Sequence, residues 1–75
     1  MDESILEEYV EYFEYLDELR DSGETNMFGA GPYLEAEFGL GRYDARKIVQ
    51  AWMETFDPER SVESRVEESY ASWTN

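Results

Sequence analysis

Cysteine and histidine are both absent from this 75-residue chain, and basic residues are scarce. Without cysteine there are no disulfides, thiolate nucleophiles or zinc–cysteine sites. Without histidine the chain lacks the commonest general base and the commonest metal ligand of proteins. No apolar run approaches the roughly 18 residues that a membrane span needs, and the acidic N-terminus is the opposite of a signal peptide. We therefore expect no enzyme, no cofactor, no metal site and no membrane contact.

The charge balance raises the question of whether the chain folds. It carries 19 acidic against 6 basic residues, a net charge of −13, and its 15 Leu, Ile, Val and Phe residues make up 20% of the sequence. Those values lie at the edge of the disordered class. Six Tyr, four Phe and two Trp argue for folding, because each buried ring removes roughly 150–250 Å² from water. We expect one folded domain with a small core.

Residues 4–22 are predicted to form the first helix. Ser4 and Glu7 have the spacing of a capping box at its start, and Gly23 suits the left-handed position after its end. Apolar side chains recur every three or four residues along one face, as in an amphipathic helix. They are Ile5, Tyr9, Tyr12, Leu16 and Leu19, widened on one side by Leu6 and Phe13.

Two further helices are predicted on either side of a glycine-bearing turn. Pro32 suits the first turn of a short helix over residues 32–38, which Gly39 ends. A third helix follows over residues 41–56, with an apolar face at helical spacing. That face consists of Ala45, Ile48, Val49, Trp52 and Phe56.

A fourth helix is expected over residues 58–73, with Asp57 as its cap and Pro58 at its first position. Its apolar stripe is thinner. The fold class is therefore all-α, a compact bundle of three to four short helices that forms a single domain over residues 1–75. We expect its core to consist of Phe13, Leu16, Leu19, Leu34, Phe38, Leu40, Ile48, Val49, Trp52 and Phe56.

The charge is concentrated in the first helix. Residues 1–24 hold ten acidic groups and one arginine, a net of −9; residues 25–56 are close to neutral, and residues 57–75 carry a net of −3. Five carboxylates repeat on the face opposite the apolar stripe. They are Glu7, Glu11, Glu14, Glu18 and Asp21.

This row of carboxylates predicts a partner-binding face. Like charges at i,i+4 destabilise a helix, and a helix selected for solubility alone would intersperse lysines. The charges stand about 5 Å apart along the axis, between the 3.4 Å spacing of phosphates on one DNA strand and twice that value. We expect a partner with a basic surface, such as a host nucleic-acid-binding complex. A merely solvated face and adaptation to high salt, suggested by one Lys against five Arg, are the alternatives.

The segments 32–38 and 41–56 also form a helix-turn-helix-like hairpin. Its cations Arg42, Arg46 and Lys47 lie where a recognition helix reads DNA. Glu35 occupies a position where such hairpins usually have a small residue, and a chain of charge −13 has little basic surface with which to release counterions from DNA. Nucleic acid is therefore the weaker expectation, and a hairpin that only packs the core is its alternative.

Five runs of sequence carry a resemblance to a known family. They are Tyr15–Gly23, Thr25–Ala30, Pro32–Leu34, Ala45–Arg46 and Trp52–Phe56. This pattern is similar to small tailed-bacteriophage proteins, which have no agreed activity and hence no functional residues to transfer. The resemblance covers more than half of the chain and leaves residues 1–14 and 57–75 outside. It implies a cytoplasmic protein of an infected bacterial cell, with a host or phage macromolecule as partner.

The leading interpretation is a non-enzymatic interaction protein whose acidic helix face acts as a DNA mimic or inhibitor. A DNA-binding regulator that uses Arg42, Arg46 and Lys47 is one alternative. A structural or oligomerisation module is another. Tyr70 and Trp73 near the C-terminus either anchor the last helix or seat a second copy of the chain in a homodimer.

Overall fold

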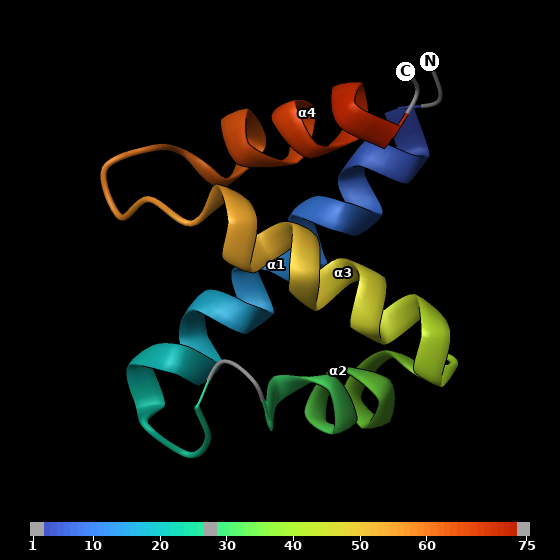
Figure 1. Ribbon diagram of the computed structural model, residues 1–75, viewed down its shortest axis with the longest axis vertical. Coiled ribbons are helices and arrows are strands. Elements are labelled where there is room, and N and C mark those ends of the chain that lie inside the picture. The colour runs from blue at the N-terminus through green and yellow to red at the C-terminus, as the bar shows by residue number, and fades with distance from the viewer. Residues whose placement is uncertain (1–2, 27–28, 74–75) are drawn as a thin grey trace.

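The apolar periodicity of the sequence produces four α-helices and a helical bundle, as predicted. The computed structural model describes residues 3–26 and 29–73, with the side chains of residues 5–26 and 29–71. No strand occurs among these residues. The helices are α1 (Glu3–Ser22), α2 (Ala30–Phe38), α3 (Arg42–Thr55) and α4 (Val62–Trp73) (Figure 1).

Glycine ends the first two helices, as the sequence predicts. Gly23 has φ 73° and its N–H donates to the carbonyl oxygen of Arg20 at 3.2 Å. Gly39 has φ 67° and its N–H donates to Glu35 O at 2.8 Å. Both angles lie in the left-handed region that side chains with a Cβ rarely adopt. At the other end, α1 begins at Glu3, so the expected cap Ser4 is already inside its first turn; its side chain lies outside the described set.

Helix α2 begins two residues earlier than predicted, at Ala30. The N–H of Gly29 donates to the side-chain oxygen Oδ1 of Asn26 at 2.8 Å, and this turn leads directly into the helix. A Cβ at position 29 would lie 2.5 Å from Thr25 Oγ1, so a larger residue there would have to displace the threonine side chain. Pro32 is consequently the third helical residue, still within the first turn where its missing N–H costs nothing.

The predicted start of the fourth helix was wrong by four residues. Asp57 does accept the N–H of Glu59 at 2.9 Å, but the chain makes only a single turn there, in which Arg60 N donates to Asp57 O. The cap is Ser61, whose Oγ accepts the N–H of Ser64 at 3.1 Å. Helix α4 therefore starts at Val62.

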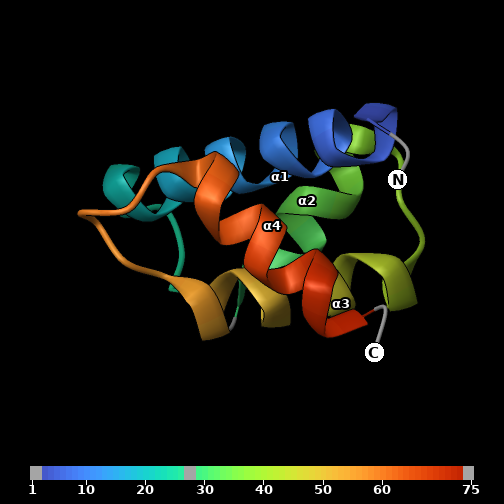
Figure 2. The same cartoon turned by 90° about the horizontal axis from the view of Figure 1, so that it is seen from above.

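The four helices pack around a common interior. Helix α1 contacts each of the other three, and α3 contacts both α2 and α4. The two views place α1 on one side of the molecule and α3 on the other, with α4 and α2 at the two ends in Figure 1 (Figures 1 and 2). The radius of gyration is 11.6 Å, close to the roughly 11 Å expected of a compact domain of this length.

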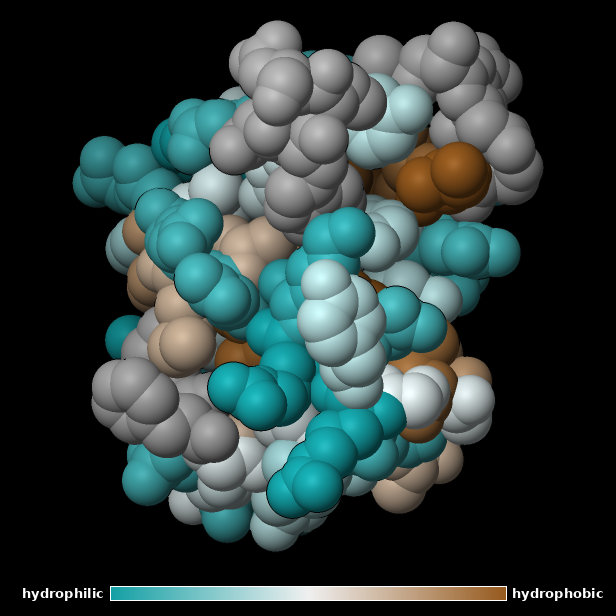
Figure 3. Space-filling model, turned by 45° about the vertical axis from the view of Figure 1, so that its right-hand side comes forward, coloured by the Kyte–Doolittle hydropathy of each residue, from teal (hydrophilic) through white to brown (hydrophobic). Residues whose placement is uncertain are grey.

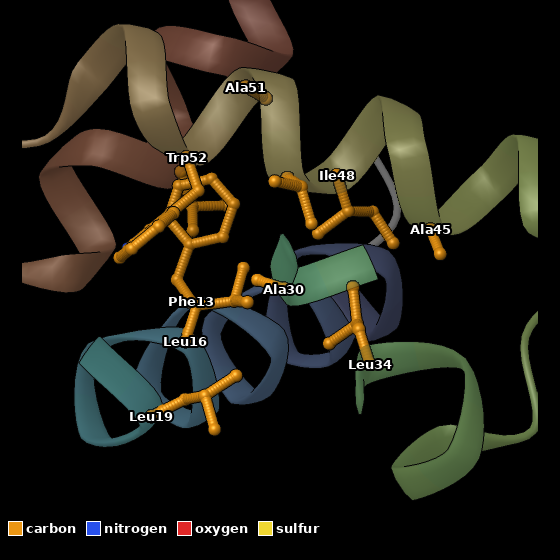
Figure 4. Packing of buried hydrophobic residues seen from close by; sticks show 11 residues of the cluster. Phe13, Leu16, Leu19, Ala30, Leu34, Ala45, Ile48, Ala51 and Trp52 are labelled. Carbon is orange, nitrogen blue, oxygen red and sulfur yellow. The ribbon is translucent and has the colours of Figure 1, made fainter. Parts of the chain in front are cut away.

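The core joins the apolar faces of α1 and α3, with Leu34 of α2 between them (Figure 4). Seven of the ten expected core residues are buried, and Ala30, Ala45, Ala51 and Val66 join them. The fully buried large side chains are Phe13, Leu16, Leu34, Ile48, Trp52 and Val66.

Three of the expected core residues are only partly buried. Phe38 packs edge-on against Tyr12 and lies at the rim of the core with Leu40, and Phe56 packs on Trp52 in the same way. The buried side of α1 is also rotated from the expected stripe toward Phe13. Ile5 is consequently 39% exposed.

Candidate functional site

All five carboxylates of the predicted acidic face lie exposed on the outer side of α1. The buried residues of α1 point into the core that this helix shares with α3, and the five carboxylates lie outside that core. Asp21 meets the neighbouring Arg20 at 3.6 Å, with both side chains well exposed. Among the described residues, no cation pairs with the remaining four. They are Glu7, Glu11, Glu14 and Glu18.

Burial raises the pKa of three tyrosines on α1, and nearby carboxylates raise the pKa of each one further. Burial raises the pKa of Tyr12 above its usual value, and the carboxylates of Glu8, Glu11 and then Asp44 raise it further. The pKa of Tyr9 is raised by the same kind of effects, burial first. Burial again comes first in raising the pKa of Tyr15. The carboxylates that act on these tyrosines belong to several elements, because Asp44 lies on α3 and Glu37, which acts on Tyr15, lies on α2.

The predicted basic residues gather on the opposite side of the molecule. Arg42, Arg46 and Lys47 lie exposed on the outer side of α3, beside Tyr43, which is 78% exposed. Figure 3 shows hydrophilic residues gathered over the start of this helix. Together with Gln50 these side chains border a surface pocket of about 480 Å³. The acidic face and the basic patch thus do not meet within one molecule.

A third charged group, which sequence reasoning missed, lies inside the bundle. Arg65 of α4 is buried, with its side chain only 3% exposed, and its Nη2 lies 2.7 Å from Oδ2 of Asp17 on α1. Oδ1 of Asp17 also accepts the indole N–H of Trp52 on α3, at 2.9 Å. One carboxylate therefore joins three helices.

The face of an aromatic ring completes this junction. The guanidinium carbon of Arg65 lies 5.6 Å from the ring centroid of Phe56, and that of Arg20 lies 4.6 Å from it. Such cation–π contacts add to the ion pair. Within the described part of the chain, Nε of Arg65 and Oγ of Ser69 are buried with no hydrogen-bond partner. The other contacts of this group join α1, α3 and α4, so its role is structural.

A signal for this junction was present in the sequence. Asp17 falls four residues after Phe13, at a position where the apolar face of α1 would continue. Arg65 falls between Val62 and Val66, within the apolar stripe of α4. Charges of opposite sign at two apolar positions indicate a buried pair, because an isolated buried charge is too costly.

Neither a cluster of metal ligands nor a membrane-spanning helix occurs in the described part of the chain. No three acidic side chains there converge in a way that could hold a metal ion. None of the described helices combines the length and the apolar character needed to traverse a bilayer. The side chain of Tyr70 is half-buried on α4, whereas that of Trp73, the other candidate for a homodimer contact, lies outside the described side chains.

Comparisons with protein-family models, with curated proteins and with solved structures find no match to this chain.

Proposed function

We propose that this is a non-enzymatic interaction protein whose acidic α1 face docks on a basic surface of a partner macromolecule. The observation that supports the proposal is the exposure of five carboxylates on one side of α1, four of them without a cation partner among the described residues. The like-charge pairs on that face cost stability. A binding role explains why the helix keeps these unfavourable like-charge pairs, whereas solvation of the surface does not require them.

The physical basis of docking is complementary charge. A row of carboxylates about 5 Å apart along the helix axis offers a Lys- or Arg-lined groove a spacing similar to that of nucleic-acid phosphates. The same field steers association and makes its rate sensitive to salt. The partner is accordingly a protein with a nucleic-acid-binding surface, and the resemblance to tailed-phage proteins favours one in the cytoplasm of a bacterial host.

A matched pair of variants tests the proposal. Immobilised wild-type protein captures partners from a bacterial lysate, and quantitative mass spectrometry compares the set with those of two triple variants of equal charge. In the face variant, glutamine replaces three residues of the acidic face. In the control, it replaces three exposed glutamates elsewhere. The two sets are Glu11, Glu14 and Glu18, and Glu24, Glu37 and Glu59.

The expected result is that the face variant loses partners that the control retains, together with their salt-sensitive elution. If both variants lose the same partners to the same extent, only the net charge matters. If both retain them all, the acidic face only solvates the protein. Either of these results refutes docking through α1.

The exposed basic patch supports a second candidate, a DNA-binding regulator. Arg46 and Lys47 on α3, with the exposed Tyr43 beside them, could contact phosphates and bases. A mobility-shift titration with duplex DNA at low and moderate salt tests this. Binding that disappears in an Arg46→Ala/Lys47→Ala variant supports the regulator and contradicts the DNA mimic.

A further inference from the structure

A groove opens between α1 and α4 where the two helices diverge. Figure 2 shows α4 starting close to α1 and moving away from it toward its end. The groove has a volume of about 240 Å³. Its lining residues are Leu6, Glu7, Val10, Glu63, Val66 and Glu67.

The floor of this groove is aliphatic and partly open. Leu6 and Val10 of α1 are half-buried, and Val66 of α4 is only 1% exposed beneath them. Leu6 and Val10 retain apolar surface in contact with water, so an apolar side chain placed here would remove that surface from solvent. The groove therefore suits the side chain of a Leu, Ile or Phe residue.

The rim of the groove is acidic on both sides. Glu7 stands on the α1 side, and Glu63 and Glu67 stand one turn apart on the α4 side. All three are exposed, and over the described residues none of them forms an ion pair. The neighbouring Glu68, by contrast, is paired with Arg60 at 2.9 Å. The rim charges are thus left for an external cation.

This combination selects one kind of occupant. Three carboxylates repel anionic partners such as nucleic acid or acidic lipids. A purely polar cation would leave the apolar surface of the floor exposed to water. A segment that carries an apolar side chain flanked by Lys or Arg matches both the floor and the rim.

We propose that the groove between α1 and α4 docks a basic amphipathic helix of a partner protein, with an apolar residue on the floor and Lys or Arg residues at the rim. The inference rests on the proposed function and deepens it. Glu7 belongs both to the acidic face and to the rim, so the groove lies beside that face and supplies the apolar anchor that charge alone lacks. Anchors of this kind, surrounded by polar contacts, carry much of the affinity of interfaces.

Two labelled probes test the proposal: a short amphipathic helical peptide of leucine and lysine, and a peptide of equal charge with serine for leucine. Fluorescence anisotropy gives their affinities for the full chain. We compare Glu63→Gln/Glu67→Gln, which neutralises the α4 side of the rim, with Glu37→Gln/Glu59→Gln, which removes the same charge at two exposed positions outside both the groove and the acidic face. The rim variant should weaken the leucine peptide about three- to tenfold and the control less than about twofold. The serine peptide should bind more weakly throughout.

Methyl NMR locates the bound peptide. The leucine peptide should shift the methyl signals of Leu6, Val10 and Val66 and leave those of Val49, on the far side of the bundle, in place. Equal weakening by the two variants, equal binding of the two peptides, or shifts elsewhere would overturn the proposal. The same methyl signals are also recorded without peptide at increasing protein concentration. If they shift, the groove binds a second copy of the chain instead, and the proposal is overturned.

These outcomes are distinct from those of the proposed function. If the groove proposal fails but lysate partners still depend on Glu11, Glu14 and Glu18, docking through the acidic face stands without the groove. The opposite result is that the rim variant weakens peptide binding while the face variant keeps all lysate partners. The groove proposal is then supported and the proposed function fails.

Discussion

Replacing Asp17 by asparagine should destabilise this protein more than any exposed charge substitution. The substitution keeps the size of the side chain and an oxygen that can accept the indole N–H of Trp52, but it removes the charge that faces Arg65. The guanidinium is then left buried, 3% exposed, without a counterion. Removing one partner of a buried pair costs about 3–5 kcal/mol.

The expected loss lies near the lower end of that range. The side chain of Asp17 is 29% exposed, so water reaches the junction and solvates part of the uncompensated charge. We therefore expect about 3 kcal/mol. A domain of 75 residues has a total stability of roughly 4–11 kcal/mol, so this is a large share. Urea denaturation followed by circular dichroism should show a midpoint lowered by about 3 M, for a slope of about 1 kcal/mol per molar.

Two further variants separate the buried charge from other effects. Asp21→Asn removes a carboxylate whose partner Arg20 is also exposed, and it should cost less than about 1 kcal/mol. The double variant Asp17→Asn/Arg65→Met should recover much of the loss of Asp17→Asn, because methionine replaces the unpaired cation with an apolar side chain. If Asp17→Asn costs no more than Asp21→Asn, or the double variant is no more stable than Asp17→Asn, the buried pair does not matter as we argue.

Three other perturbations have expected outcomes. Ser61→Ala removes the hydroxyl that caps α4 by accepting the N–H of Ser64 and should cost about 1 kcal/mol in urea denaturation, whereas an unchanged midpoint would mean that water replaces the cap. Gly39→Ala introduces a Cβ at φ 67° and should cost about 1 kcal/mol; circular dichroism should show a lower melting temperature, and no change would contradict the strain. The contribution of three α1 tyrosines to stability should be constant below about pH 10 and be lost above it, because the unfolded chain ionises tyrosine at about 10 while the folded pKa values of these three tyrosines are higher. Urea midpoints at increasing pH measure this, and Tyr12→Phe should reduce the fall; a fall of the same size in that variant would remove Tyr12 from the explanation.

Local patterns predicted the helices well because they depend on near neighbours. The spacing of apolar residues in α1 and α3, together with Gly23 and Gly39 at helix ends, needs no tertiary information to be interpreted. The exposure of the acidic face follows in the same way, since it lies opposite the apolar stripe. Each of these features is a property of one helix.

Features decided by contacts between helices could not be predicted from the same patterns. Asp57 and Ser61 are both good caps four residues apart, and Asp57 even forms the expected bond to a backbone N–H. Helix α4 is capped by Ser61 and starts at Val62, and in it Arg65 reaches Asp17 of α1. A local pattern cannot decide between the two caps, because it does not include a pairing with a residue 48 positions away along the chain.

The core shows the same limit. Ranking residues by size and apolar character selects Phe38 and Phe56, yet a domain this small has little interior, and rings at its edge remain partly exposed. Alanines are buried instead, because helices pack closely where side chains are small. A ranking by size does not select them. Ala30, Ala45 and Ala51 are each 5% exposed or less.

The buried junction and the acidic face have opposite effects on stability, and together they favour a binding role. Like-charge neighbours along α1 cost about 1–2 kcal/mol in total, while the pair between Asp17 and Arg65 fixes the same helix against α3 and α4. A helix that carried charge only for solubility would need neither the unbroken row of carboxylates nor an internal clamp. A helix that must present a fixed row of charges to a partner needs both, because a preorganised surface loses less entropy when it binds.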